Sequence, residues 1–341
     1  MRILLTADPM IPVPPAGYGG IERIVDALLR LYRAQGHEIG LVSHPGSTAQ
    51  ADARFPWPCG PGGTLRNALY LRRAVRKFRP DLLHSFSRLA YLAPLMISPL
   101  PKIMSYQRHA GGRQISWAAR IGGRSLRFTG CSEFICSMGR PSGGEWRVIP
   151  NFVEPDKYTF VPKVSSDAPL VFLSRIESIK GPDVAIAIAR AAGRRLILAG
   201  NPAEQGPERE FWERAIAPHL GRDGIEWVGE VNDLQKSELL GRAAALVLPI
   251  RWDEPFGIVF VEALAAGTPV ITCARGGAPE IIEPGVTGFF VRDARGGSEA
   301  VRRLDELDRA ACRRAAETRF SLQTCAKSYL ELYREMAADR R

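Results

Sequence analysis

The chain has 341 residues, of which 45% are hydrophobic and 24% are charged, values typical of a globular protein with room for two α/β domains. It contains no low-complexity tract, no internal repeat and no apolar run long enough to span a bilayer. Its six cysteines are scattered without C-x-x-C spacing, which favours reduced thiols over a zinc site. We therefore expect a cytoplasmic protein with reduced thiols, whose first residues form a buried strand rather than a signal peptide.

The first half of the chain alternates short apolar runs with segments of helical periodicity. Because strand, helix and strand follow one another, this order predicts a parallel sheet with ligands at the carboxyl ends of its strands. We expect strands at residues 2–7, 37–43, 81–86 and 101–106, and helices at residues 21–36, 67–78 and 115–125.

The net charge of +10 is concentrated in the same half. Residues 1–150 carry 20 Lys and Arg against 8 Asp and Glu, whereas residues 151–341 carry 26 against 28. Many of the basic residues lie in a predicted helix at 64–79, which is either an ordinary solvated surface or a helix that rests on anionic lipid headgroups. No nucleic-acid-binding motif is present. The expected buried face of this helix consists of Leu65, Ala68, Leu69, Val75 and Phe78.

The second half repeats the alternation after a segment rich in Pro, Ser and Asp at residues 147–169, which is typical of a linker. We therefore expect two doubly wound, Rossmann-like α/β domains that face each other across a cleft. The expected boundaries are 1–152, 153–321 and a C-terminal helix at 322–341. Strands are expected at residues 169–175, 194–200, 225–231, 244–250, 268–274 and 287–293, and helices or turns at residues 181–193, 207–220, 235–243, 257–267 and 279–285.

A basic turn follows the first strand of the second half. Arg175 ends the expected strand, and Lys180 stands just before Gly181 and Pro182, with the proline at the first helical position. A helix N-terminus has free N–H groups and a partial positive charge, so Arg175 and Lys180 would form a diphosphate site there. The alternative is a solvated Arg and Lys on an ordinary turn.

Two carboxylates, Glu254 and Glu262, flank the almost wholly apolar run EPFGIVFVE. Glu254 precedes a turn, and Glu262 lies about two turns into the helix that follows. Each carboxylate can accept hydrogen bonds from a different pair of hydroxyls on one extended ligand, and the backbone N–H groups of Phe256, Gly257 and Ile258 would face a negative group between them. A structural role at the helix N-terminus would explain Glu254. It would not explain Glu262, whose burial without a partner would be costly.

These segments resemble the nucleotide-sugar glycosyltransferases of family 4, which have the GT-B fold. The stretch EPFGIVFVEALAAGTPVITCARGGAPEIIEPGVTGFFV resembles the C-terminal signature of that family, including its E-x7-E spacing, and SRIESIKGPD resembles its diphosphate-binding turn. In the first half, PPAGYGGIERIVDALLRLYRAQGHEIGLVS resembles the N-terminal Gly-rich loop and helix of the family. The resemblance covers nearly the whole chain and implies that the last helix packs back toward the first domain.

The resemblance also implies roles for individual residues. Arg175 and Lys180 would bind the donor diphosphate, Glu262 the ribose hydroxyls, and Glu254 the hydroxyls of the donor sugar. No metal ion or cofactor would be required. The sequence departs from the family pattern at Phe86, where many relatives have a histidine, and His109 is a candidate to supply an imidazole instead. The remaining donor contacts would come from backbone atoms at Gly19, Gly20, Phe256, Gly257 and Ile258.

We therefore expect an enzyme that moves a hexose from a nucleoside diphosphate sugar, with UDP as first choice, onto a glycan, lipid-linked or natural-product acceptor with retention of configuration. The inner face of the membrane is a possible location for a peripheral enzyme with this basic first half. The alternatives are a catalytically inactive sugar-nucleotide-binding protein and a nucleotide-sugar epimerase. A nicotinamide dehydrogenase is rejected, because no G-x-G-x-x-G follows the first strand and no acid follows the second.

Overall fold

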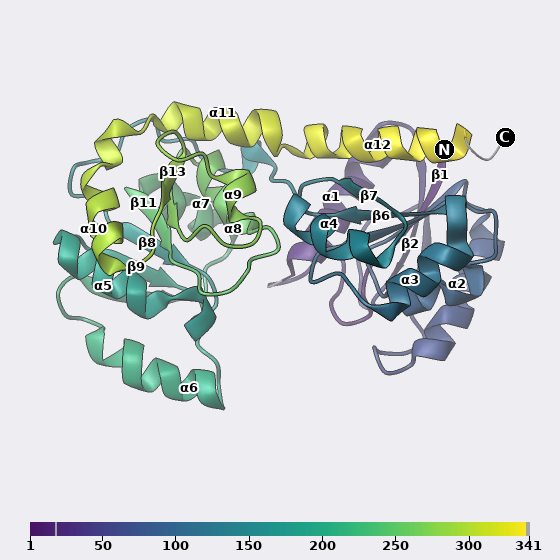
Figure 1. Ribbon diagram of the computed structural model, residues 1–341, viewed down its shortest axis with the longest axis horizontal. Coiled ribbons are helices and arrows are strands. Elements are labelled where there is room, and N and C mark those ends of the chain that lie inside the picture. The colour runs from purple at the N-terminus through teal and green to yellow at the C-terminus, as the bar shows by residue number, and fades with distance from the viewer. Residues whose placement is uncertain (18, 339–341) are drawn as a thin grey trace. The chain divides into compact units, whose positions relative to one another are not determined.

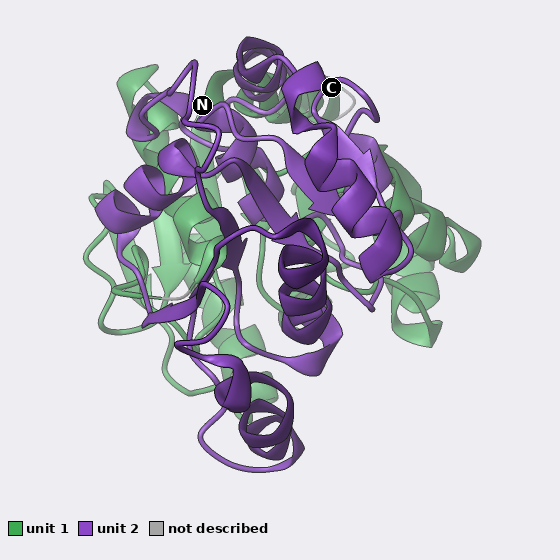
Figure 2. Cartoon of the chain, turned by 90° about the vertical axis from the view of Figure 1, so that its left-hand side faces the viewer, with its two compact units in different colours: residues 1–151, 322–341 green, residues 152–321 purple. Residues whose placement is uncertain are grey.

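The computed structural model describes residues 1–17 and 19–338 (Figure 1). The chain forms two compact units, which are coloured separately in Figure 2. Unit 1 consists of Met1–Asn151 together with Leu322–Arg341, and unit 2 is the continuous segment Phe152–Ser321. Each unit contains one wholly parallel sheet covered by helices. That the first domain binds the acceptor and the second binds the donor stays a prediction. The cleft expected between the two domains also stays a prediction.

Unit 1 has a seven-stranded sheet in the order β3-β2-β1-β4-β5-β6-β7. The order reverses direction between β1 and β4, which pair in parallel with Leu5 beside His84. Periodicity did not predict three of the strands: the inner strand β6 and the short edge strands β3 and β7, of which β7 lies partly in the expected linker. The strands are β1 (Arg2–Thr6), β2 (Glu38–Ser43), β3 (Ala53–Pro56), β4 (Leu82–Ser85), β5 (Lys102–Tyr106), β6 (Leu126–Gly130) and β7 (Glu145–Val148).

The last helix of the chain, α12 (Leu322–Ala338), belongs to unit 1 and packs against α1. Its Tyr333 is fully buried, and the Tyr333 hydroxyl lies 2.5 Å from Nδ1 of His84 and 3.5 Å from the hydroxyl of Tyr32. The other helices of unit 1 are α1 (Gly20–Ala34), α2 (Thr64–Phe78), α3 (Arg113–Gly122), α4 (Glu133–Gly139) and the 3-10 helices η1 (Leu89–Leu95), η2 (Gly123–Ser125) and η3 (Arg140–Ser142).

The buried face of α2 differs from the one expected. Leu65 and Leu69 are exposed, and the buried residues include Asn67 instead. The Asn67 side chain donates hydrogen bonds to the backbone carbonyls of Cys59 and Gly60, which turns this polar residue inward. The expectation was therefore wrong for both leucines, and Val75 is only half-buried, because polar contacts with the preceding loop fix the rotation of the helix. The buried residues of α2 are Asn67, Ala68, Leu71, Ala74 and Phe78.

Unit 2 has a six-stranded sheet in the order β10-β9-β8-β11-β12-β13, and its order reverses direction between β8 and β11. These two strands pair in parallel, with Leu170 beside Ala245. All of the residues of β8 and β11 are buried, as expected for the centre of a parallel sheet. The strands are β8 (Leu170–Leu173), β9 (Leu196–Ala199), β10 (Ile225–Gly229), β11 (Ala245–Leu248), β12 (Val270–Thr272) and β13 (Gly288–Phe290).

The predicted helices of unit 2 lie largely where they were expected, but the helices Ala294–Arg302 and Arg309–Arg319 were not predicted, and two predicted helices differ in extent. The segment 207–220 is not one helix but three short ones, and α9 is shorter than predicted. No helix within residues 1–17 and 19–338 is long and apolar enough to cross a membrane. The helices are η4 (Pro155–Lys157), η5 (Ser178–Lys180), α5 (Pro182–Ala192), α6 (Pro207–Phe211), η6 (Trp212–Ile216), η7 (Ala217–His219), α7 (Asp233–Arg242), α8 (Ile258–Ala265), α9 (Ala278–Ile281), α10 (Ala294–Arg302), η8 (Leu304–Glu306) and α11 (Arg309–Arg319).

Candidate functional site

An ion pair lies where the strand order of unit 2 reverses. Lys180 lies in the loop after β8, and Glu254 lies in the loop after β11, so the central strands bring together two residues that are far apart in the sequence. The Nζ atom of Lys180 lies 2.6 Å from Oε2 of Glu254, and the two side chains are 10% and 14% exposed. The point at which the strand order of a doubly wound sheet reverses is the usual place for a ligand.

The surroundings of Lys180 hold its ammonium group in place. The Nζ atom lies over the ring of Trp252, 4.6 Å from the ring centroid, and the indole N–H of Trp252 donates to Oε2 of Glu254 over 3.0 Å. Gly181 has a φ of 73°, and a Cβ atom there would lie 2.2 Å from the carbonyl oxygen of Pro249. Only glycine therefore allows the turn after Lys180 to pack against the end of β11. Trp252 was missed by the sequence analysis, although it lies two residues before Glu254.

Arg175 also lies in the loop after β8, two residues beyond the end of the strand that it was expected to close, and its environment differs from that of Lys180. Its side chain is half exposed and forms an ion pair with Glu177, two residues further on. The turn therefore presents one buried cation and one exposed cation. An exposed ion pair of this kind contributes little to stability, so the Arg175 side chain is able to exchange its partner for a bound anion.

The N-terminus of α8 presents backbone donors beside Glu254. The helix begins after Gly257, whose φ of 95° is in the left-handed region, and Phe256 is buried against Phe320. Within the described part of the chain, the backbone N–H groups of Phe256, Gly257 and Ile258 donate no hydrogen bond. A helix N-terminus with unpaired N–H groups attracts a negative group.

Glu262 lies on α8 with its side chain 12% exposed, and it has two partners from the protein. The hydroxyl of Tyr158 donates to Oε1 over 2.7 Å, and Nζ of Lys236 donates to the same oxygen over 2.5 Å. Burial of Glu262 therefore does not by itself require a ligand, because Lys236 balances its charge, and the binding of ribose by Glu262 stays a prediction. The second oxygen, Oε2, has no hydrogen-bond partner among residues 1–17 and 19–338. No sequence signal pointed to Tyr158, which lies 104 residues before Glu262.

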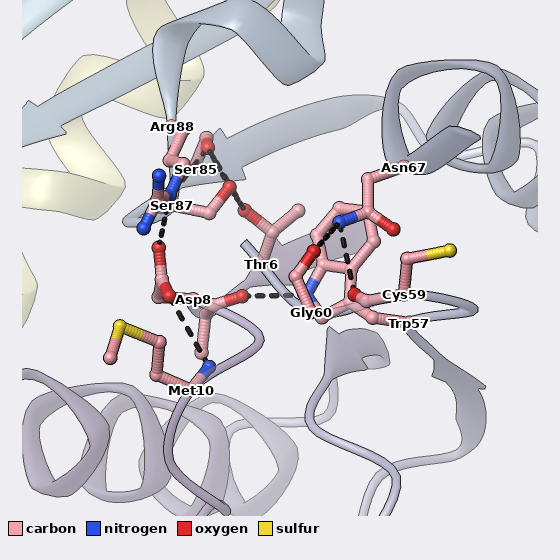
Figure 3. A network of polar contacts seen from close by, with 11 residues as sticks. Thr6, Asp8, Met10, Trp57, Cys59, Gly60, Asn67, Ser85, Ser87 and Arg88 are labelled. Atoms are coloured by element: carbon pink, nitrogen blue, oxygen red, sulfur yellow. Dashed lines mark hydrogen bonds and ion pairs between the residues drawn. The ribbon is translucent and has the colours of Figure 1, made fainter. Parts of the chain in front are cut away.

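A polar network lies at the corresponding point of unit 1, where the strand order reverses between β1 and β4 (Figure 3). Asp8 follows β1 and Arg88 follows β4, and the two side chains form an ion pair of 3.0 Å. Behind it, the hydroxyls of Thr6, Ser85 and Ser87 are hydrogen-bonded to one another over 2.9–3.0 Å. None of these five residues forms a recognisable motif, so the sequence alone did not indicate them.

The histidines of unit 1 have different environments. His84 is fully buried, and its ring nitrogens lie 2.5 Å from the Tyr333 hydroxyl and 2.6 Å from the Ser105 hydroxyl. Burial lowers the pKa of His84 to about 3, so its imidazole is neutral. Phe86 is buried against His84, with ring centroids 4.2 Å apart. His109 is exposed and touches Phe134 edge-on.

The remaining predicted residues lie at the start of α1. Gly20 is the first residue of the helix, and Gly19 precedes it. A Cβ atom on Gly19 would lie 2.7 Å from Cβ of Pro15, so the backbone passes close to the preceding loop. No contact within unit 1 shows whether Gly19 and Gly20 bind a sugar-nucleotide donor, so their role stays a prediction. Among the residues that the structure describes, no group of three or more His, Cys, Asp and Glu could hold a metal ion.

Comparisons with known proteins agree with this architecture. Residues 158–317 match the family model of the group 1 glycosyl transferases, and residues 18–157 match that of glycosyltransferase family 4. Glycogen synthase of Mycobacterium tuberculosis is 27% identical to the chain, over 98% of this chain and 94% of its own length.

Solved structures are similar over the whole length. AviGT4, a glycosyltransferase involved in avilamycin A biosynthesis, is 28% identical with a TM-score of 0.74, and the match covers 99% of this chain and 98% of AviGT4. Anabaena HepE in complex with UDP and glucose has a TM-score of 0.74 at 18% identity, covering 97% and 99% of the two chains. The two matches adjoin and together span residues 18–317, so the protein is a glycosyltransferase of the family 4 type, and it has the GT-B glycosyltransferase fold.

Proposed function

We propose that the protein transfers a hexose from a nucleoside diphosphate sugar, with UDP as the nucleotide, to a hydroxyl of a glycan, lipid-linked or natural-product acceptor. The observation that carries this proposal is the site of unit 2, where Lys180 and Glu254 lie beside the unpaired N–H groups at the start of α8. A cation, a carboxylate and a helix N-terminus together match the charges and hydroxyls of a sugar nucleotide. The presence of UDP in the HepE structure supports this choice of nucleotide.

Each group of the site would act on one part of the donor. Lys180, Arg175 and the N–H groups of Phe256, Gly257 and Ile258 would bind the diphosphate. Their positive charge would stabilise the negative charge that develops there when the bond between the anomeric carbon and the phosphate oxygen breaks. The acceptor oxygen would form the new bond to the anomeric carbon, and the acceptor hydroxyl would give its proton to the departing phosphate oxygen.

The two carboxylates would bind hydroxyl groups of the donor. The Oε2 atom of Glu262, which has no partner in the described residues, would accept from the ribose, while Lys236 and Tyr158 hold the other oxygen. Glu254 would accept from the sugar. Because Glu254 already holds Lys180, sugar and diphosphate recognition would be coupled through one ion pair. We further propose retention of configuration, which is checked by the anomeric NMR signal of the product.

The acceptor would bind to unit 1. This unit carries the excess of positive charge, and its Asp8 and Arg88 lie at the carboxyl ends of β1 and β4. His109, Gly19 and Gly20 remain candidates for contacts with the transferred sugar. We propose that the enzyme works in the cytoplasm in polysaccharide or natural-product synthesis. An anionic membrane surface would be its place of action, and nucleic acid would not be a partner.

Calorimetric titration with UDP, GDP, ADP and TDP in the presence of EDTA tests the donor site. We expect one nucleotide to bind without metal, because Lys180, Arg175 and the helix N-terminus provide positive charge. Lys180→Ala should weaken that binding, whereas Lys163→Ala, at an exposed position in the same unit, should leave it unchanged. Equal affinities of these two variants would contradict the proposal, and binding that disappears in EDTA would contradict metal independence.

A catalytically inactive sugar-nucleotide-binding protein is the second candidate function. Phe86, buried against His84 and Tyr329, stands where the family resemblance leads us to expect a histidine, and an apolar ring at this place would favour a loss of catalysis. Release of the nucleoside diphosphate from a bound sugar nucleotide, in the presence of a panel of acceptors, distinguishes the two. Turnover supports the enzyme, and binding without any turnover supports the inactive protein.

A further inference from the structure

Exposed apolar side chains of unit 1 gather on α2, on α3 and in the turn that follows η1. The 3-10 helix η1 packs against both α2 and α3, which lie on the same side of unit 1 (Figure 1). Single exposed apolar residues are ordinary on a protein surface, whereas a group of them marks an interaction site. Among the described residues of unit 1, only one other large apolar side chain, that of Met10, is exposed. The members of the group are Leu65 (72% exposed), Leu69 (43%), Ile97 (87%), Trp117 (71%) and Ile121 (43%).

Basic residues share the outer faces of the two helices with these apolar side chains. On α2, Leu65 and Leu69 are followed at helical spacing by Arg72 and Arg76, which are also exposed. On α3, Trp117 has basic residues one turn before it and one turn after it. All of these residues point away from the core, because the buried positions of α2 and α3 lie on the opposite faces. The basic neighbours of Trp117 on α3 are Arg113 and Arg120.

This surface lacks negative charge. Residues 53–132 contain 14 Lys and Arg but a single acid, Asp81. Neither α2, η1 nor α3 contains an Asp or Glu. The positive charge on these helices is therefore not balanced from within them, and it attracts a partner with many negative groups.

We propose that α2, the turn at Ile97 and α3 form a membrane-docking face that binds an anionic lipid bilayer. Leu65, Ile97 and Trp117 would enter the boundary between headgroups and acyl chains, and the arginines would bind lipid phosphates. Two convex helix surfaces, with arginine beside exposed tryptophan and leucine, fit a planar, negatively charged and partly apolar surface. The membrane-docking face deepens the proposed function, because docking would bring the enzyme to a lipid-linked acceptor. Only this biological purpose rests on the proposed function.

Vesicle flotation of the full chain tests this inference. We expect binding to vesicles of equal parts phosphatidylcholine and phosphatidylglycerol, weaker binding as salt rises, and no binding to phosphatidylcholine alone. Vesicles that contain brominated lipid should quench the tryptophan fluorescence, and Trp117→Phe should remove most of that quenching. The absence of binding to the anionic vesicles at low salt would overturn the proposal.

Matched variants separate this face from general surface properties. Leu65→Ser with Trp117→Ser should lower the vesicle partition coefficient by about tenfold or more, because both side chains leave the bilayer boundary. Leu234→Ser is the control, since Leu234 is also 72% exposed but lies on α7 of unit 2. Arg72→Gln with Arg73→Gln should weaken binding and reduce its salt dependence. Arg214→Gln with Arg295→Gln removes two exposed arginines of unit 2 as the matched control.

The outcomes also distinguish this proposal from the proposed function. The serine variants should keep the circular dichroism spectrum and the UDP affinity of the unaltered protein, because both residues are exposed on unit 1 and neither belongs to the site built by unit 2. Vesicle binding without UDP binding would contradict the donor site alone, and UDP binding without vesicle binding would contradict the membrane-docking face alone. Concentration-dependent self-association that disappears in the serine variants, without vesicle binding, would show instead that this face binds a second copy of the chain.

Discussion

The two units have the same topology around the point where their strand order reverses, but they place different ion pairs there. In unit 1 the pair is Asp8 and Arg88, whose side chains are 23% and 44% exposed. In unit 2 it is Lys180 and Glu254, at 10% and 14%, with the indole of Trp252 against both. A desolvated pair is held firmly because each charge depends on the other, whereas an exposed pair exchanges readily with solvent. The difference indicates a pre-organised site in unit 2 and an adaptable one in unit 1.

Removing one member of the buried pair should have the largest effect. Lys180→Ala leaves the Glu254 carboxylate without its cation, so we expect the free energy of unfolding to fall by about 3 kcal/mol. We also expect the nucleotide affinity to fall by at least about tenfold, since a charged hydrogen bond to the diphosphate is lost. Urea denaturation and calorimetry measure the two effects. A stability close to that of Lys163→Ala would show that the pair is not desolvated as the structure indicates.

The interior of unit 1 should respond to pH through His84, which lies on β4 just before the exposed pair. Burial lowers its pKa from 6.5 to about 3, so below pH 6.5 the unfolded chain binds a proton that the folded chain does not. The contribution of His84 to the free energy of unfolding is therefore fully present above pH 6.5 and decreases as the pH falls toward 3. Between about pH 6.5 and 5 we expect a loss of about 2 kcal/mol. Urea denaturation at several pH values measures it.

The control for this pH dependence is His84→Asn, which should be less stable at neutral pH but should lose less stability on acidification. Other groups that titrate in the same range cancel in the difference between the two proteins. An equally steep pH dependence in both proteins would contradict the neutral, buried His84.

The partners of Glu262 should have a smaller effect on donor binding. Tyr158→Phe removes one hydrogen bond to Oε1, and we expect UDP binding to weaken by about 1 kcal/mol. The preference for UDP over 2′-deoxy-UDP should also be measured, because a merely structural role of Tyr158 would leave this preference unchanged. This preference should shrink in Tyr158→Phe and disappear in Glu262→Gln. A preference that persists in Glu262→Gln would remove Glu262 from ribose recognition.

The exposed pair of unit 1 should matter least for stability. Arg88→Gln should change the free energy of unfolding by less than about 1 kcal/mol, as is usual for exposed ion pairs. UDP affinity should stay the same, while the KM for the acceptor should rise if unit 1 binds the acceptor. Denaturation, calorimetry and steady-state kinetics measure the three quantities. A weaker UDP affinity in Arg88→Gln would contradict the division of roles between the units.

The sequence was informative where local chemistry determines the structure. The alternation of strands and helices, Pro182 at the start of α5 and the turn before α8 all depend on neighbouring residues, and the predicted elements are found close to these positions. The two glutamates were placed correctly in a loop and on a helix. Family resemblance strengthened these expectations, because the same segments carry its motifs.

The sequence was not informative where distant segments meet. Tyr158, directly after η4, and Lys236, on α7, both contact Glu262 on α8. The periodicity of the sequence does not show that these segments lie beside α8. The predicted rotation of α2 about its axis was wrong for a related reason. Hydrophobicity selects Leu65 and Leu69 for the core, whereas the hydrogen bonds of Asn67 to the preceding loop turn both leucines outward.

The placement of α12 in unit 1 has a consequence for biosynthesis. A ribosome makes residues 1–151 first, yet the tyrosine that buries His84 is residue 333, close to the end of the chain. Unit 2 is continuous, so all of its residues have been synthesised before this helix appears. We expect the second unit to complete its folding during translation while the first waits for the last helix. The order of maturation would then be the reverse of the order of synthesis.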